Sequence, residues 1–317
     1  MASNLSSILL RHGSKGLMLR STSTIRYLSS SVKVSKDLLL KLRKRTGFAI
    51  SKCHAALAQH NNNLDEAENW LSAQAEKEGW AKANKLQNRK TAEGLIGIYY
   101  KEPYAAMVEV NCETDFVARN ENFLNLLNDV ALTTYHHGSK SIQNTDIATM
   151  IRYNSEEIGN LTTHDSQRSL INITAATIGK IGENLILRRG IFVAAPANGI
   201  LNYYIHSVGK QISSDLNVGK YGAIIASENI DKSQSTSETS KLQQLNLSRQ
   251  LCQHVVGVNP VRIRRDAARS EIDEDALLDQ AFLLDNSVQV GELVERENLR
   301  VLDFVRYQCG EVADDID

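Results

Sequence analysis

Apolar side chains recur every three or four positions through residues 34–75, which is the spacing of amphipathic helices. Three helices are expected there. The first ends near Gly47, the second spans about 51–59, and the third opens at the N-cap residue Asn63. We therefore predict a three-helix bundle over 34–75, followed by a charged, alanine-rich helical linker over 76–93.

Beyond residue 93 the apolar period shortens to two, which is typical of β-strands. The expected strands are 94–100, 104–111, 185–193, 199–204, 220–226 and 299–308, and a helix is expected over 241–256. This layout predicts an α+β fold in which two α+β subdomains, 94–197 and 198–317, follow the bundle in tandem. Each subdomain is expected to hold its own small antiparallel sheet.

A polar corner follows the strand predicted at 104–111. Thr114 is a good N-cap, and Asp115 and Phe116 would occupy the first turn of a helix whose apolar pattern continues to residue 131. Phe116 either projects outward as a short rigid wedge or packs back on the sheet, with Asp115 complementing the helix dipole. Spacing alone favours packing back, because helix-capping acids are common.

Composition places the chain among ordinary soluble globular proteins. Its 317 residues allow two or three domains, its hydrophobic content is 42%, and its net charge is -1. That charge argues against neutralisation of nucleic-acid phosphates as the main task, and no apolar run reaches the roughly 18 residues of a membrane span. The four cysteines are scattered without metal-ligand spacing, which favours buried, reduced thiols.

The chain also lacks the motifs of an enzyme. No G-x-x-x-x-G-K-[ST] loop is present, so direct nucleotide binding is not expected. There is no H-E-x-x-H, no G-x-S-x-G and no Cys/His metal spacing, and the pair His136–His137 fits a helix C-terminus better than a metal site. We therefore predict a protein that is not an enzyme and carries neither cofactor nor metal.

The N-terminal segment differs from the rest. Residues 1–36 contain no Asp or Glu, whereas they contain six Arg or Lys residues among serines and leucines. This composition is typical of a mitochondrial transit peptide, which we assign to 1–33, and it predicts a location in the mitochondrial matrix. A plain disordered tail is the alternative.

Four ordered motifs resemble the elongation factor Ts family. Residues 111–120 (Asn-Cys-Glu-Thr-Asp-Phe-Val-Ala-Arg-Asn) contain its Thr-Asp-Phe-Val-Ala motif, and residues 42–53 resemble its Leu-Arg-x-x-Thr-Gly segment. Residues 178–189 resemble its Lys-Ile-Gly-Glu-Asn-Ile segment, and residues 204–206 resemble its Tyr-x-His. The resemblance covers roughly 35–310.

This resemblance implies a fold and a function. The family combines an N-terminal bundle like that of ubiquitin-associated (UBA) domains with tandem α+β units. It exchanges the nucleotide of elongation factor Tu, so the implied partner is mitochondrial elongation factor Tu in a 1:1 heterodimer. In relatives the pair that matches Asp115 and Phe116 inserts into the GTPase domain and dislodges Mg²⁺, while Thr114 and Val117 would fix the turn. The bacterial coiled-coil hairpin has only residues 260–276 available here, which argues against bacterial-style dimerisation.

Secondary partner contacts are implied at two further motifs. Ile181 and Gly182 match residues beside the wedge in relatives, although Gly182 could equally serve a tight turn. His206 matches an interface histidine, and its alternative is a core histidine under the hairpin that the strands 199–204 and 220–226 are expected to form.

The N-terminal bundle carries a third such contact. Thr46, Gly47 and Ile50 fall where the relatives' bundle meets the GTPase, although relatives often carry Met near position 50.

Two other classes of function are open from the sequence. The UBA-like bundle could belong to a ubiquitin-binding adaptor, which the transit peptide disfavours. The basic stretches, such as 41–45, could belong to an RNA-binding or ribosome-associated module, although a solvated face is the usual meaning of such a run.

Overall fold

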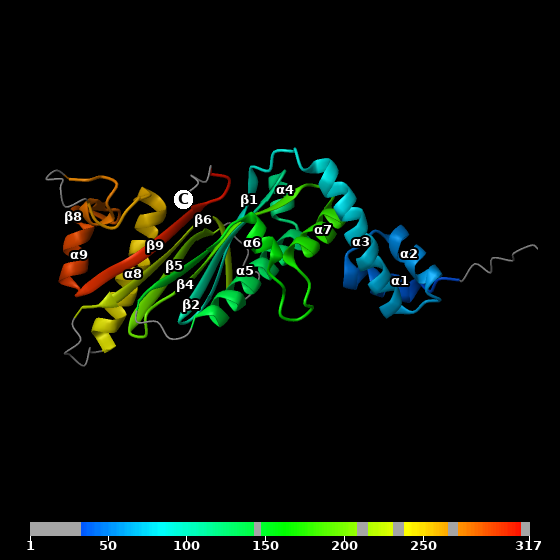
Figure 1. The fold of residues 1–317 in the computed structure, drawn as a ribbon, viewed down its shortest axis with the longest axis horizontal. Coiled ribbons are helices and arrows are strands. Elements are labelled where there is room, and N and C mark those ends of the chain that lie inside the picture. Colours follow the sequence, from blue (N-terminus) through cyan, green and yellow to red (C-terminus); the bar gives the residue numbers. More distant parts are fainter. Residues whose placement is uncertain (1–32, 143–146, 208–214, 231–237, 266–271, 312–317) are drawn as a thin grey trace, which may run out of the picture.

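The computed structural model describes residues 33–142, 147–207, 215–230, 238–265 and 272–311. The molecule is elongated, with the N-terminal bundle at one end, the sheet in the middle, and helices α8 and α9 at the other end (Figure 1). The predicted transit peptide lies outside the described residues, except for Lys33. So do the central parts of the segments 206–218 and 260–276.

The three predicted N-terminal helices are confirmed as α1 (Lys36–Thr46), α2 (Ile50–Gln59) and α3 (Leu64–Leu86). Asn63 caps α3, because its side chain accepts hydrogen bonds from the backbone N–H groups of Asp65 and Glu66. Helix α3 continues without a break for 23 residues, so the bundle and the start of the expected linker share one helix.

All six predicted strands are present: the last keeps its expected bounds, four extend slightly beyond theirs, and the strand expected at 220–226 is twice as long as predicted. They are β1 (Glu93–Lys101), β2 (Tyr104–Cys112), β4 (Leu185–Ala194), β5 (Gly199–Ser207), β6 (Leu216–Asn229) and β9 (Leu299–Gln308). The helix expected at 241–256 is α8 (Glu238–Val258). Elements without a sequence prediction of their own are β3 (Thr149–Tyr153), α6 (Ser155–Asn160), α7 (Leu170–Ile181), η1 (Leu277–Asp279), β7 (Ala281–Phe282), β8 (Asp285–Gln289) and α9 (Val290–Arg296).

The strands of both predicted subdomains form one seven-stranded antiparallel sheet, which corrects the expectation of two small sheets. The order is β3-β4-β2-β1-β6-β5, and β9 also pairs with β6. The 14 residues of β6 make this possible, because residues 216–219 pair with β1 whereas residues 221–229 pair with β9. One long strand therefore belongs to both halves.

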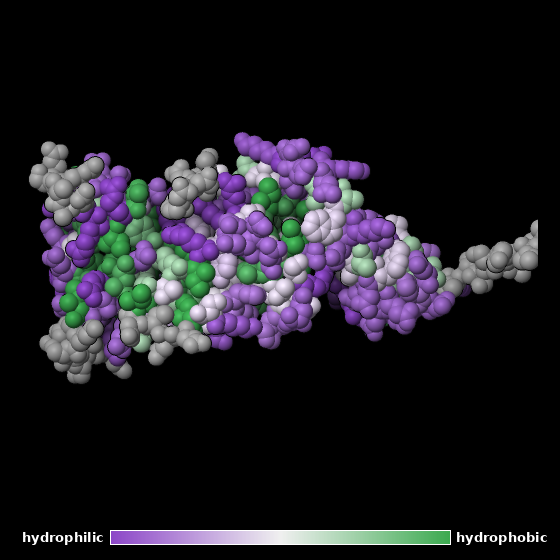
Figure 2. Space-filling view, viewed as in Figure 1, coloured by the Kyte–Doolittle hydropathy of each residue, from purple (hydrophilic) through white to green (hydrophobic). Residues whose placement is uncertain are grey.

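The two halves of the sheet pack on each other through a shared apolar layer. It contains Ile96, Ile98, Met107, Ile191 and Val193 from the first half, and Leu201, Ile224, Ala226 and Val305 from the second half. A separate core lies between β1, β2, β4 and the helices α5 and α7, and a third lies under α8 and α9. On the face drawn in Figure 2, hydrophobic residues gather over the sheet, whereas the N-terminal bundle is largely hydrophilic.

A buried ion network also joins the halves. Glu109 of β2 is fully buried and pairs with Arg189 of β4 at 2.8 Å. Arg189 pairs with Glu311 at 2.7 Å, and its guanidinium lies 4.0 Å from the ring centroid of Tyr307 in β9. The end of the described chain is thereby held against the first half of the sheet.

Candidate functional site

The corner after β2 presents an aromatic ring to solvent. Thr114 is the N-cap of the four-residue helix α4 (Asp115–Ala118), and its hydroxyl accepts a hydrogen bond from Val117 N at 3.4 Å. Val117 and Ala118 are buried, whereas the side chain of Phe116 is 80% exposed. The alternative in which Phe116 packs back on the sheet is therefore wrong. Asp115 pairs with Arg119 at 3.3 Å across one helical turn.

The helix predicted from this corner to residue 131 is in fact two helices. Helix α4 ends at Ala118, and α5 (Glu121–Ser141) begins after Asn120, whose side chain accepts a hydrogen bond from Asn122 N at 2.8 Å. Asn120 is a strong N-cap in its own right, so it starts a new helix there. The separation sets Phe116 on a short helix of its own.

Two glutamates that the sequence analysis did not single out hold the corner against the end of α7. Glu183 accepts hydrogen bonds from the backbone N–H of Thr114 at 3.1 Å and from its hydroxyl at 2.9 Å. In the opposite direction, Glu113 accepts from Asn184 N at 2.8 Å and from Arg89 at 3.1 Å. Glu183 lies within the 178–189 motif, which was the signal that could have identified it.

Ile181 and Gly182 lie at this same turn. Ile181 is the last residue of α7, and Gly182 caps it with a φ of 89°. A Cβ atom at Gly182 would meet nothing within 4 Å, so backbone conformation rather than space requires glycine there. The tight-turn interpretation of Gly182 is thus confirmed, and its contact with a partner stays a prediction.

The turn between α1 and α2 approaches the corner from the N-terminal bundle. A Cβ atom added at Gly47 would lie 3.7 Å from the side-chain oxygen of Asn122, and Lys180 Nζ lies 5.1 Å from the ring centroid of Phe48. Ile50 is 46% exposed beside this turn. The structure therefore gathers three of the four motifs, from the N-terminal turn, the α4–α5 corner and the end of α7.

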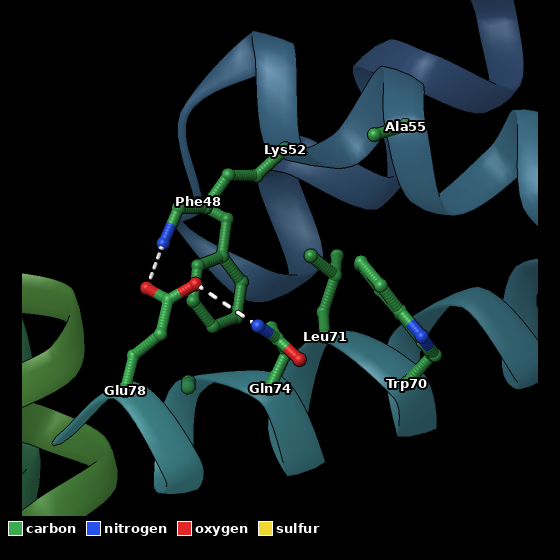
Figure 3. A pocket seen from close by; sticks show the side chains of 8 residues that line it. Phe48, Lys52, Ala55, Trp70, Leu71, Gln74 and Glu78 are labelled. Atoms are coloured by element: carbon green, nitrogen blue, oxygen red, sulfur yellow. Dashed lines mark hydrogen bonds and ion pairs between the residues drawn. The ribbon is translucent and has the colours of Figure 1, made fainter. Parts of the chain in front are cut away.

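The interior of the bundle explains which groups this turn can present. Phe48 lies inside the bundle beside Leu71, next to a cavity of about 100 Å³ that Lys52 and Glu78 border with an ion pair of 2.5 Å (Figure 3). Thr46 is also buried and donates its hydroxyl hydrogen to Leu42 O at 2.7 Å. Among the three contacts predicted at this turn, Thr46 is buried and Gly47 has no side chain, so Ile50 is the one with an exposed side chain.

His206 lies apart from the other motifs. It is exposed on β5, 3.5 Å from the hydroxyl of Tyr204, so the core-histidine alternative is wrong. Because β5, β6, β1 and β2 are successive strands, His206 is three strand spacings from Cys112, or roughly 14 Å. A partner touching both places would have to span the end of the sheet.

The chemistry available at the site is that of recognition. Among the described residues, no group of three or more His, Cys, Asp or Glu side chains is placed to hold a metal ion. Burial raises the pKa of the Cys112 thiol beside the corner to about 12, which keeps it protonated and unreactive. None of the helices in the described ranges has the length and apolarity needed to cross a membrane.

Comparison with known proteins identifies the family. Residues 23–81 match the family described as "Elongation factor Ts, mitochondrial, N-terminal", and residues 113–275 match "Elongation factor TS". The mitochondrial elongation factor Ts of Nematostella vectensis is 42% identical over 294 residues, which cover 87% of this chain and 99% of that protein. The chain belongs to the mitochondrial elongation factor Ts family.

Other members of the elongation factor Ts family are similar to this chain to nearly the same degree. The protein of Mus musculus is 40% identical over 89% of this chain and 86% of its own length, and that of Aedes aegypti is 40% identical over 87% and 88%. Elongation factor Ts is the nucleotide exchange factor of elongation factor Tu and is not an enzyme. Family membership therefore favours exchange over the ubiquitin-adaptor and RNA-binding alternatives.

Proposed function

We propose that this chain binds mitochondrial elongation factor Tu as a 1:1 heterodimer in the mitochondrial matrix and accelerates release of GDP from it. The observation that carries the proposal is the exposed ring of Phe116 beside Asp115, at the corner that matches the family's Thr-Asp-Phe-Val-Ala motif. An aromatic side chain that is mostly exposed to water costs hydrophobic free energy, which contact with a partner recovers.

Exchange requires coupling between two binding events. If binding of this chain weakens the partner's affinity for GDP by some factor, GDP weakens binding of this chain by the same factor. The chain must therefore bind more tightly to a partner conformation with a distorted nucleotide site. A rigid insertion suits this task, because packed protein interiors switch between discrete arrangements and do not deform continuously.

The corner has the properties of such a wedge. Thr114 fixes the start of α4, Val117 anchors it in the core, and Phe116 and Asp115 project from it. We propose that these two side chains enter the GTPase domain and displace Mg²⁺, which neutralises charge on the nucleotide phosphates. Loss of the ion removes part of the attraction that retains GDP.

The remaining predicted contacts complete the interface in this proposal. Gly47, Ile50 and the Ile181–Gly182 turn lie around the corner and would border the inserted ring, with Thr46 holding its turn from inside the bundle. His206 would form a second contact across the end of the sheet.

Release of fluorescently labelled GDP from purified mitochondrial elongation factor Tu tests the proposal. Phe116→Ala should slow release by about thirtyfold or more at a fixed, subsaturating factor concentration, since a buried interface aromatic typically contributes about 2–4 kcal/mol. Leu284→Ala, which truncates another exposed apolar side chain far along the chain, is the matched control and should leave the rate unchanged. Wild-type rates from folded Phe116→Ala would refute the wedge.

A further inference from the structure

The α4 corner cannot be held by its own helical hydrogen bonds. It contains four residues, and a helix of that length has no stability in water without outside support. Its Asp115–Arg119 pair is solvent-exposed and therefore weak. Something outside α4 must keep the exposed Phe116 in one orientation.

Glu183 supplies that support through the cap residue itself. Its carboxylate lies 3.1 Å from Thr114 N and 2.9 Å from Thr114 Oγ1, so both donors of Thr114 point at one charged group. Hydrogen bonds to a carboxylate are about twice as strong as those between neutral groups. The hydroxyl has a single hydrogen, and it is donated in a hydrogen bond to the Glu183 carboxylate.

That donation fixes how Thr114 caps α4. With its hydrogen directed at Glu183, Thr114 Oγ1 presents its lone pairs to Val117 N, at 3.4 Å. One carboxylate thereby sets the rotamer of the cap, and the cap sets the start of the helix that carries Phe116.

We propose that Glu183 is a positioning residue for the wedge: it pre-organises α4 through Thr114 so that Phe116 is presented in its inserting orientation. The inference deepens the proposed function and rests on it. Binding through a pre-organised segment avoids the entropic cost of ordering that segment, so its loss lowers the exchange activity without removing any contact to the partner.

Glu113 provides a matched comparison. It joins the same two segments by accepting from Asn184 N at 2.8 Å, but it makes no hydrogen bond to the side chain of the cap. If Glu183 acts by holding the segments together, removing either glutamate has the same effect. If Glu183 acts on the cap, only its own removal affects the wedge.

GDP release from mitochondrial elongation factor Tu separates these cases. Glu183→Ala should lower the exchange activity at subsaturating factor by roughly tenfold or more, the loss expected when charge-assisted hydrogen bonds are removed. Glu113→Ala should change it less than threefold. Equal losses in the two variants would overturn the proposal.

A double-mutant cycle tests whether Glu183 acts through Phe116. In a Phe116→Ala background there is no ring to orient, so adding Glu183→Ala should cost less than twofold more. A further tenfold loss in that background would mean that Glu183 serves the interface or the fold in another way, and the proposal would fail.

Hydrogen exchange of the complete free chain gives a readout that does not depend on any partner. Backbone amides of residues 117–120, which donate hydrogen bonds within the corner, should exchange at least tenfold faster in Glu183→Ala than in Glu113→Ala, with the amides of α3 and β1 unchanged. Unchanged protection at 117–120 would overturn the inference even if the wild-type chain accelerates GDP release. Conversely, wild-type protein without exchange activity would refute the proposed function, whereas this measurement would still decide the role of Glu183.

Discussion

Two phenylalanines seven positions apart have opposite environments. Phe116 on α4 is 80% exposed, whereas Phe123 on α5 is fully buried in the core between the helices and the sheet. The same truncation should therefore separate a recognition residue from a folding residue. Phe116→Ala should change the free energy of unfolding by less than about 0.5 kcal/mol.

Phe123→Ala is its counterpart and should lower the free energy of unfolding by about 3–5 kcal/mol, because it leaves a cavity in a packed core. Chemical denaturation of the two variants beside the wild type measures both effects. A large loss of stability in Phe116→Ala would show that its ring supports the fold, contrary to its exposure.

Asp129 gives a residue-scale prediction on pH. Burial chiefly raises the pKa of this α5 carboxyl from 3.8 to about 6, with Asp165 adding to the rise and Lys180 opposing it. Because the folded-state pKa exceeds the unfolded value, the folded state binds this proton more tightly, and this contribution to stability is lost as the pH rises from about 4 to about 6.

Asp129→Asn removes the ionisation, so its stability relative to the wild type should rise with pH. We expect the difference in the free energy of unfolding to grow by about 2 kcal/mol between pH 4 and pH 7. Urea denaturation across this range measures it. A difference that stays constant with pH would mean that the carboxyl ionises as readily in the folded as in the unfolded chain.

Sequence reasoning at this scale identified the residue types better than their surroundings. Thr114 was predicted as a cap and is one, but spacing alone favoured a buried Phe116, since local pattern does not reveal which side of a corner is covered. The local pattern also did not reveal that His206 is exposed, and the contact of Glu183 with the cap joins segments far apart in sequence. Glu183 reaches Thr114 across 69 residues, a contact that no periodicity predicts.

At the scale of elements, close packing of α3 on α7 fixes the N-terminal bundle to the sheet. A Cβ atom added at Gly79 would lie 1.6 Å from the carbonyl oxygen of Ala175, and one at Gly179 would lie 2.4 Å from that of Ala75. The two helix backbones therefore touch where glycines leave space. This contact orients the bundle relative to the α4 corner.

Gly79→Ala should consequently lower the free energy of unfolding by about 1–3 kcal/mol through overpacking, although alanine is the better helix former. Gly159→Ala in α6 is the matched control, since its added carbon would make only an ordinary contact of 3.6 Å with Ile171. That variant should be neutral or stabilising by up to about 1 kcal/mol. Thermal unfolding of both variants checks the opposite signs, and equal effects would contradict tight packing at Gly79.

Element prediction succeeded where the pattern was strong and local. The helices of the bundle, the strand pairs β1–β2 and β5–β6, and the last strand were all predictable. Each of these elements buries one face, so its apolar residues recur with the period of a helix or a strand. The break between α4 and α5 was missed, because Asn120 interrupts an apolar pattern that otherwise runs on. The short strands β7 and β8, of two and five residues, are too short to show a period.

The whole-molecule arrangement depends on a pairing that sequence patterns do not specify. Pairing of β1 with β6 joins residues about 120 positions apart, and it places the strands of the two expected subdomains in one sheet. The hydrophobic alternation of each strand is satisfied equally well by two small sheets or by one large sheet. Only the three-dimensional packing distinguishes them.

The apolar layer shared by the two halves of the sheet predicts that the first half does not fold without the second. In a fragment comprising residues 34–197, the side chains of Ile96, Ile98, Met107 and Ile191 would lose the second half of the sheet that buries them completely in the whole chain. β1 would also become an open edge. The fragment should therefore lack a cooperative unfolding transition and bind an apolar dye, whereas 34–317 should unfold in one transition with little dye binding.

Co-expression with 198–317 should restore the transition, because the missing apolar surface is then supplied by a separate chain. A fragment that unfolds cooperatively by itself, with no more dye binding than 34–317, would instead support two independent subdomains.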